Sequence, residues 1–274
     1  MQKVVIIGTD SYIATGLEYY LKDCKVDKLC FDNWHDNLEL LQEADYVINF
    51  SIAPDFSTRK IEPADVLDVQ IANYLKNCKT RYIFISSRKV YGISDALTIH
   101  KETDALCGCD LYSHNKIMTE QALKDILKDR LTVLRISNVI GEPVKRKGYK
   151  TFVGWISENF LKYGKLTLTQ NADAVKDFIT KDFLHENIAA LIYRHKTGIY
   201  NVSAGFGTTV RDILSGYVGV QNIDFQAQDL PIMDQFVLDN TKLIQATNCE
   251  FTSEKLAKYL SVCHSKVLQY KDLT

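Results

Sequence analysis

The chain has 274 residues, 46% of them hydrophobic, and its 33 basic and 34 acidic residues give a formal net charge of −1. Such a chain can bury a full core as a globular protein, and its balanced charge gives no reason to expect nucleic acid or an anionic membrane as a partner. The 7 cysteines are odd in number and lack the spacing of a metal site, so we expect reduced thiols, no bound metal and a cytoplasmic location. No apolar run approaches the roughly 18 residues of a membrane span. A small-molecule partner is therefore expected.

The first predicted element is an apolar, β-branched run at residues 3–7, which indicates a strand buried on both faces of a parallel sheet. Residues 8–14 predict a tight turn, and residues 15–21 a helix. A strand, a turn and a helix N-terminus together can bind a phosphate. The spacing is that of a G-x-x-G-x-x-G turn, with Ser11 and Ala14 in the second and third glycine places. Because the pattern is degraded, it fits an ordinary turn equally well.

A second strand is predicted at residues 28–31, and it ends at Asp32 and Asn33. Asp32 lies 24 residues after Gly8 (32 − 8 = 24), close to the spacing of about 20 residues at which an acid receives the ribose hydroxyls of a dinucleotide. The alternative is a loop aspartate that caps a helix at residues 37–42. A carboxylate at this position would repel a 2′-phosphate, so we predict NAD(H) over NADP(H).

The remaining strands and helices alternate as in a doubly wound parallel sheet, in which ligands bind at the carboxyl ends of the strands. Ser51, Ser86 and Ser87 fall at that edge. The segments after residue 208 are short and mixed, which predicts a small α/β substrate lobe. We expect a Rossmann-type domain at 1–142 with 175–204, and the lobe at 143–174 with 205–274. The predicted strands are 46–50, 82–85, 131–136, 166–168, 178–179 and 198–203, and the predicted helices are 65–76, 112–127, 151–163 and 183–194.

A basic patch at residues 145–150 contains Lys145, Arg146, Lys147 and Lys150. It fits a solvated loop and an anion-binding segment equally well.

Tyr112 and Lys116 are four residues apart in a helical pattern, so they share one helix face. A tyrosine, whose pKa is ordinarily about 10, needs a nearby cation and a dry pocket to act as a base near neutrality. Lys116 could supply the cation, and the Ser87 hydroxyl could hold a substrate oxygen. The alternative is an exposed helix pair, which the preceding strand end and glycine turn disfavour.

With these residues in view, the sequence resembles the extended short-chain dehydrogenase/reductases, in particular their nucleotide-sugar epimerase, dehydratase and reductase branch. The resemblance covers nearly the whole chain, and the spacing of 25 residues from Ser87 to Tyr112 (112 − 87 = 25) is part of it. Its landmarks are the turn 8–14, Asp32-Asn33, the segment 86–92, Tyr112 to Lys116 with Glu120, the segment 134–141, Asp177-Phe178-Ile179 with Asp182, and the strand 198–202.

The resemblance implies a role for each matching residue. Tyr112 is the acid/base, Lys116 lowers its pKa and holds the nicotinamide ribose, and Ser87 binds the reacting hydroxyl or carbonyl. The implied NAD(H) site consists of Gly8, Asp10, Ser11, Tyr12, Ile13, Asp32, Asn33, Phe50 and Ser51 with Tyr112 and Lys116. The implied substrate contacts are Ser86, Ser87, Asn138, Lys176 and Arg211.

Several positions depart from the family pattern. Ser11 replaces a glycine, Asn115 replaces the small residue usual before the lysine, and the asparagine common around residues 65–70 is missing. Arg88 and Lys89 stand where 4,6-dehydratases carry an Asp-Glu pair, which disfavours a dehydratase. Relatives of the GDP-fucose synthase type, which are 3,5-epimerase/4-reductases, carry a cysteine close to the position of Lys89. This chain has none there, which disfavours a 3,5-epimerase as well.

The leading hypothesis is an NAD(H)-dependent enzyme that reduces the 4-keto group of a nucleotide-diphosphate sugar, as in polysaccharide biosynthesis. The alternatives are a nucleotide-sugar 4-epimerase that forms a transient ketone, a non-catalytic dinucleotide-binding protein and a reductase of a non-sugar carbonyl. The resemblance also implies a homodimer.

Overall fold

The computed structural model describes every residue except 143–151, 169, 226, 228 and 272–274. The predicted basic patch and the first residue of the predicted helix 151–163 lie outside the described residues. The rest of that helix is α4 (Phe152–Tyr163).

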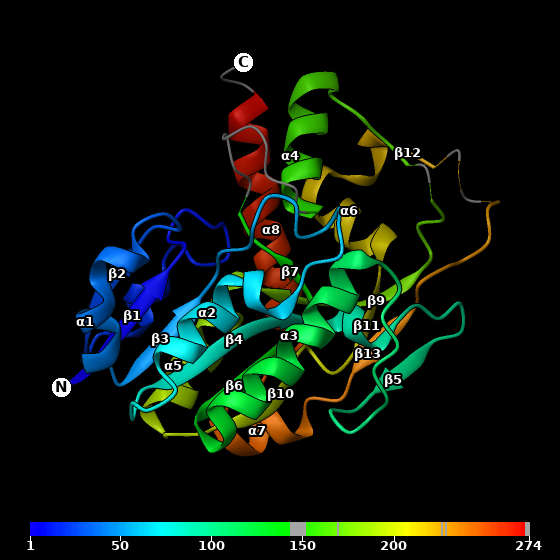
Figure 1. Ribbon diagram of the computed structural model, residues 1–274. Coiled ribbons are helices and arrows are strands. Elements are labelled where there is room, and N and C mark those ends of the chain that lie inside the picture. Colours follow the sequence, from blue (N-terminus) through cyan, green and yellow to red (C-terminus); the bar gives the residue numbers. More distant parts are fainter. Residues whose placement is uncertain (143–151, 169, 226, 228, 272–274) are drawn as a thin grey trace.

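A sheet of six parallel strands forms the centre of the molecule (Figure 1). Its order is β10-β6-β4-β3-β1-β2, as a doubly wound fold requires. The strands are β1 (Gln2–Ile7), β2 (Cys24–Leu29), β3 (Tyr46–Asn49), β4 (Arg81–Ser87), β6 (Leu131–Ile136) and β10 (Gly198–Val202). The predicted Rossmann-type sheet is therefore confirmed.

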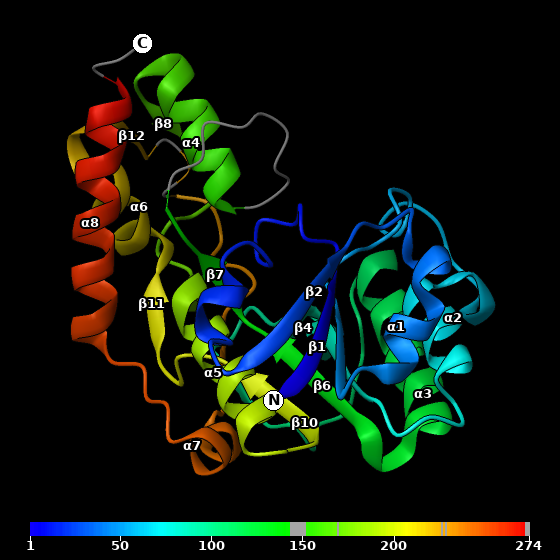
Figure 2. The same ribbon diagram turned by 90° about the vertical axis from the view of Figure 1, so that its left-hand side faces the viewer.

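Helices cover both faces of this sheet, and the alternation of side chains along β1 shows how. Val4 and Ile6 pack toward α5 (Lys181–Tyr193), whereas Val5 and Ile7 pack toward the opposite layer. That layer consists of α1 (Leu38–Glu43), α2 (Leu67–Tyr74) and α3 (Leu111–Leu127). Figure 2 shows the three helices on one side of the strands and α5 on the other. Burial on both faces explains why the strands are continuously apolar.

The structure differs from the predicted elements near the N-terminus. The second strand spans residues 24–29, not 28–31, and it pairs with β1 from Gln2 to Ile7. The predicted helix 15–21 is absent as an α-helix, because turns lead only to a 3₁₀ helix at Leu17–Tyr20. Gly16, with φ 96°, adopts the left-handed conformation there and prevents a continuous helix from residue 11. Other 3₁₀ helices are Trp34–Asn37, Pro63–Asp65, Arg88–Tyr91, Lys128–Arg130 and Val220–Asn222.

A second sheet lies beside the central one and combines strands from both predicted parts of the chain. β9 (Val175–Thr180) pairs with β7 (Asn138–Ile140), β11 (Gly207–Thr209) and β13 (Phe236–Leu238), and β13 also pairs with β5 (Thr98–His100). β8 (Leu166–Thr167) pairs with β12 (Ile223–Asp224). The lobe helices are α4, α6 (Val210–Val218), α7 (Thr241–Thr247) and α8 (Ser253–Lys271). In Figure 2, α4, α6 and α8 lie on the opposite side of the molecule from α1, α2 and α3.

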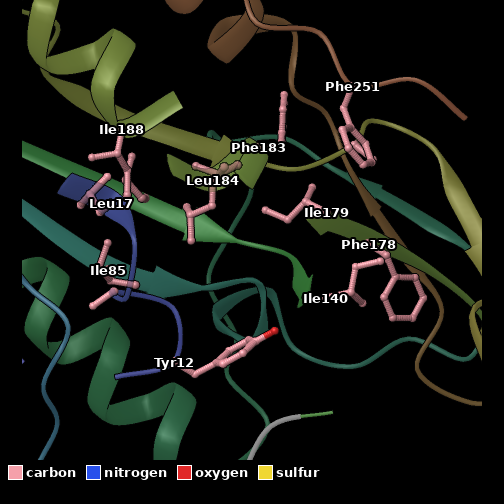
Figure 3. Close-up of a cluster of buried hydrophobic side chains, with 14 of the residues drawn as sticks. Tyr12, Leu17, Ile85, Ile140, Phe178, Ile179, Phe183, Leu184, Ile188 and Phe251 are labelled. Carbon is pink, nitrogen blue, oxygen red and sulfur yellow. The ribbon is translucent and has the colours of Figure 1, made fainter. Parts of the chain in front are cut away.

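The expectation of short, mixed segments after residue 208 is wrong for α8, which has 19 residues. Leu256, Leu260, Cys263 and Val267 are buried at helical spacing and join the core around α5. Figure 3 shows this core passing from Leu17, Leu184 and Ile188 to Phe178 and Phe251. We propose the division into residues 1–142 with 175–204 and residues 143–174 with 205–274 as functional parts that share this core. Among the described residues, no helix has the length and apolarity to span a membrane.

Candidate functional site

The carboxyl ends of β1, β3 and β4 bring the predicted serines and the glycine turn to one edge of the sheet. Gly8 has φ +81°, and a Cβ on it would lie 2.2 Å from the Ser51 Oγ and 2.8 Å from the Ser51 backbone nitrogen. Only glycine fits such a position without movement. Phe50, just before Ser51, is buried, and its N–H donates to the Ile7 carbonyl at 2.9 Å. The two loops are therefore held against each other.

A cavity of about 310 Å³, the Asp32 cavity, opens beside these loops. Asp32 and Ser51 both line it, as does Phe56, while Asn33 turns away and accepts from the Cys30 N–H at 2.9 Å. Aromatic walls with carboxylates at the rim suit a purine ring and ribose hydroxyls. Its lining includes Phe31, Asp32, Trp34, Ser51, Phe56 and Asp68.

The turn after Gly8 presents mainly backbone to this edge. The Tyr12 side chain is buried in the core (Figure 3). Its hydroxyl donates to the Glu142 carbonyl at 3.3 Å. The Ile13 carbonyl is bonded to the His185 Nε2 at 2.8 Å. Asp10 is exposed, and the Ser11 N–H donates to the Gly8 carbonyl at 3.0 Å. Because no α-helix follows, the turn lacks a strong helix dipole for a phosphate.

Tyr112 stands in the first turn of α3, which a capping box fixes. The Asp110 carboxylate accepts from the Ser113 N–H at 2.8 Å, and the Ser113 hydroxyl accepts from the Asp110 N–H at 3.0 Å. Burial raises the pKa of Tyr112 to about 12, and the neighbouring Ser87 hydroxyl lowers it by a smaller amount. The structure thus brings together the predicted serine and tyrosine, with the tyrosine protonated at neutral pH.

Lys116 lies beneath this pair and is buried. Its Nζ donates to the Ile85 carbonyl at 2.8 Å and lies 5.8 Å from the centroid of the Tyr112 ring. Burial lowers the pKa of Lys116, while the charges of Asp68 and Glu120 raise it. The expected lowering of the Tyr112 pKa by Lys116 is not seen, because burial dominates at Tyr112 and the ammonium points to the main chain of β4.

Ser86 and Ser87 point to opposite faces of β4, as neighbours in a strand must. Ser86 is 1% exposed, and its hydroxyl donates to the Glu120 Oε1 at 2.5 Å. The Glu120 carboxylate also accepts a hydrogen bond from the Arg135 Nη2 at 2.7 Å. This buried position differs from the substrate contact predicted for Ser86.

Arg88, next to Ser87, connects the site with the lobe. Its guanidinium forms a two-pronged ion pair with Asp234 and stacks 4.1 Å from the centroid of the Phe236 ring. The Lys176 Nζ donates to the same Asp234 carboxylate at 2.9 Å. Two cations therefore share one carboxylate next to Ser87, which leaves a positive charge in this part of the site.

Lys176 also lines a second cavity, of about 200 Å³, which we name the Lys176 cavity. Aromatic and apolar side chains surround it, and Val210 lies just before Arg211. The Arg211 Nε donates to the Asp173 Oδ1 at 2.6 Å, and the guanidinium stacks over Phe225. Asn138, at the start of β7, is half-buried. The cavity is lined by Phe152, Trp155, Leu168, Asn171, Lys176 and Leu214, among others.

Two buried polar residues belong to the site although sequence patterns did not identify a role for them. The Asn115 side chain donates to the Phe56 and Arg59 carbonyls at 2.8 and 2.9 Å and accepts from the Ile61 N–H at 3.2 Å. It therefore anchors the loop that walls the Asp32 cavity. Asp68, on α2, is buried and lines the same cavity. The only signal in the sequence was that Asn115 and Asp68 are polar residues inside predicted helices. Their roles could not be predicted, because their hydrogen-bond partners lie on other elements.

Comparisons with known proteins agree with this geometry. The model of the NAD dependent epimerase/dehydratase family matches residues 2–203. A comparison with curated proteins gives no match. Among solved structures, UDP-N-acetylglucosamine 4-epimerase from Methanobrevibacter ruminantium M1 has a TM-score of 0.79 at 18% identity, over 98% of each chain.

Two further solved structures show the same fold. UDP-glucuronic acid 4-epimerase from Bacillus cereus has a TM-score of 0.78 at 17% identity, over 98% of this chain and 99% of that one. dTDP-4-dehydrorhamnose reductase from Yersinia enterocolitica has a TM-score of 0.73 at 16% identity, over 96% of this chain and 100% of that one. Epimerases and a reductase thus resemble this chain to a similar degree.

Proposed function

Because the chain belongs to the NAD-dependent epimerase/dehydratase family, we propose that it reduces the 4-keto group of a nucleotide-diphosphate sugar with NADH. The observation that carries the proposal is the placement of Ser87 beside the Tyr112 hydroxyl, between two cavities. Phe56 of the Asp32 cavity contacts the Tyr112 ring at 5.8 Å between centroids. On the other side, Arg88 connects Ser87 to Asp234 and thereby to Lys176.

The residues around the Asp32 cavity fit a dinucleotide. Asp32 would receive the adenosine ribose hydroxyls, the backbone of Gly8 to Ile13 would face the pyrophosphate, and Lys116 and Tyr112 would meet the nicotinamide ribose. When bound, such a cofactor supplies the hydride. The carboxylate at Asp32 favours a cofactor without a 2′-phosphate.

Tyr112 and Ser87 then supply the proton chemistry. A tyrosine with a pKa of about 12 is protonated at neutral pH, so it can donate a proton to a carbonyl oxygen that gains negative charge. The Ser87 hydroxyl can hold the same oxygen by donating a second hydrogen bond. This protonation state serves reduction directly, whereas oxidation of a sugar hydroxyl, the first step of epimerisation, needs a base.

The turn at residues 8–16 also supports a reductase. A reductase must exchange its cofactor after each turnover, whereas an epimerase regenerates the cofactor in place and profits from retaining it. Ser11 and the missing α-helix leave the turn with fewer means to hold a pyrophosphate tightly. We therefore propose that the dinucleotide exchanges readily.

The lobe side supports a substrate with a diphosphate. Lys176, Arg88 and Arg211 provide cations near the Lys176 cavity, whose aromatic and apolar lining suits a base. The solved epimerase from Methanobrevibacter ruminantium M1 is in complex with UDP-N-acetylmuramic acid, a substrate class that we extend to this chain as a proposal.

The test is incubation of the purified protein with UDP- and dTDP-linked 4-keto sugars and NADH. Consumption of NADH in proportion to reduced sugar supports the reductase. The second candidate, a 4-epimerase, is motivated by the overlap with solved 4-epimerases, and it predicts interconverted sugars with no net NADH consumption. Binding of NADH without conversion of any sugar would contradict both and support a non-catalytic dinucleotide-binding protein.

Replacing Asp32 with asparagine should weaken NADH binding by about 10-fold or more, because hydrogen bonds to a charged group contribute about 1.5–3 kcal/mol. The preference against NADPH should decrease as well, because repulsion of the 2′-phosphate is lost. Fluorescence titrations with NADH and NADPH measure both effects. Asp36→Asn, at an exposed position in the following 3₁₀ helix, is the matched control. An unchanged ratio of the two dissociation constants would show that Asp32 does not select the cofactor.

A further inference from the structure

A buried carboxylate on α2 lies between the cofactor-side loops and the Lys116 ammonium. Asp68 is only 3% exposed. Its Oδ1 accepts hydrogen bonds from the Tyr82 hydroxyl at 2.8 Å and from the Asn49 Nδ2 at 3.0 Å. No arginine or lysine in the described part of the chain forms an ion pair with it. A carboxylate this deep is costly unless a nearby positive charge compensates it.

The compensating charge is Lys116. Asn49 and Phe84 are direct neighbours on β3 and β4, and the Lys116 Nζ lies 4.6 Å from the Phe84 ring centroid. Asp68 contacts the first of these two neighbours and Lys116 the second, while α2 packs against α3. The charges of Asp68 and Lys116 each favour the ionised form of the other.

Glu120 is the other carboxylate that acts on Lys116, and it is already engaged. It lies one turn further along α3 and forms a buried ion pair with Arg135 on β6. Tyr112 is protonated, and the remaining surroundings of the ammonium are the Phe56 and Phe84 rings and the Ile85 carbonyl. Asp68 is therefore the carboxylate available to balance the buried ammonium.

Asp68 also supports the glycine turn through Asn49. The Asn49 Nδ2 donates to the Ser51 carbonyl at 3.1 Å, and its Oδ1 accepts from the Ser51 N–H at 2.8 Å. Ser51 in turn is the residue that a Cβ at Gly8 would strike. The path Tyr82–Asp68–Asn49–Ser51 thus ends at the turn expected to meet the pyrophosphate.

We propose that Asp68 is a positioning residue: it is the counter-ion of Lys116 and, through Asn49, fixes the Ser51 loop against Gly8. This inference rests on the proposed function, since it assigns Lys116 to the nicotinamide ribose. Asp68 acts through Lys116 and Asn49 and touches no reacting atom. It occupies the part of α2 in which the family asparagine is missing.

Asp68→Asn separates the two roles, because an amide oxygen can still accept from Asn49 and Tyr82 but carries no charge. Lys116 would then lose its proton at a lower pH. Between about pH 6 and about pH 10, NADH affinity and kcat/KM of the variant should stay near wild type at the acidic end and fall about 10-fold or more at the alkaline end. Asp68→Ala should bind NADH more weakly than wild type across this whole pH range, because it also loses the hydrogen bonds from Asn49 and Tyr82. Asp125→Asn, an exposed change on α3, should follow wild type. Parallel profiles for wild type and Asp68→Asn would overturn the proposal.

Unfolding of the protein without cofactor gives an independent test. Lys116→Met and Asp68→Asn should each lower Tm, and the double variant should lose less than the sum of the two, because neither charge is then left buried alone. Additive losses would overturn the proposal. If the coupling and the NADH profiles hold while no sugar is converted, the proposed reaction fails and the role of Asp68 stands.

The pH dependence of unfolding has a definite sign. Burial lowers the folded-state pKa of Lys116, so stability rises with pH between that pKa and the unfolded value of 10.5. In Asp68→Asn this rise should begin at a lower pH. Burial raises the pKa of Asp68 itself, so the wild type, unlike Asp68→Asn, loses stability as the pH rises from the unfolded value of 3.8 through the folded-state pKa of that carboxyl. Tm measured across pH separates the two contributions, and identical Tm curves would contradict both.

Discussion

Tyr112→Phe is expected to lower kcat for a 4-keto sugar by about 10²–10⁴-fold, the usual contribution of a positioned proton donor. The phenyl ring keeps the contact with Phe56 but has no proton to give to the carbonyl oxygen. KM should change little, because the hydroxyl acts mainly as charge develops on the carbonyl oxygen. The measurement is the initial rate of NADH oxidation.

Tyr163→Phe, at an exposed position on α4, is the control and should retain wild-type rates. Both variants should unfold close to the wild-type Tm, since each removes one hydroxyl. Full activity in Tyr112→Phe would show that the proton comes from another group, and the assignment of the site would have to be abandoned.

Arg135→Met is expected to destabilise the fold by about 3–5 kcal/mol, because it leaves the Glu120 carboxylate buried without its partner. The two side chains are only 4% and 7% exposed, and the Arg135 Nη1 also donates to the Tyr91 hydroxyl at 3.1 Å. For a protein of this size, such a loss lowers Tm on the order of 10 °C. Denaturant and thermal unfolding measure the effect.

The double variant Glu120→Gln/Arg135→Met should be less destabilised than Arg135→Met alone, since no charge is left unpaired. Arg130→Met is the control for the loss of an arginine without an ion pair, because that side chain donates only to main-chain carbonyls and is partly exposed. An Arg135→Met variant within about 1 kcal/mol of wild type would show that Glu120 takes up a proton or water at little cost.

Local pattern was sufficient for the sheet, and it also supplied the residues that we propose for the chemistry. Val4 to Ile7 are apolar without alternation because both faces of β1 are covered, and that property is written in the sequence. Tyr112 and Lys116 are four residues apart on a helix that Asp110 and Ser113 begin, so their shared face was predictable. Ser87 and Asp32 follow strands that end at one edge.

The errors arose where a feature depends on contacts between distant elements. Residues 15–21 have helical spacing, but Gly16 in the left-handed conformation limits them to a 3₁₀ turn. Ser86 lies next to Ser87, yet the pleat of β4 directs it toward Glu120 and away from the edge. The spacing of Leu256, Leu260, Cys263 and Val267 was visible and predicts α8, so that helix could have been found.

The sequence by itself determined the parallel sheet, through its continuous apolar runs, and the family, through its resemblance to known members. The serine, tyrosine and lysine of the site remain predictions from the same resemblance and from their spacing. Only the tertiary structure decided which charges meet. Arg135 on Glu120 and Asp234 between Arg88 and Lys176 join residues from different elements. The energy of such pairs depends on how deeply the charges are buried and how far apart they lie, and a local sequence pattern contains neither quantity. The same holds for the raised pKa of Tyr112, which is set by the groups that close around it.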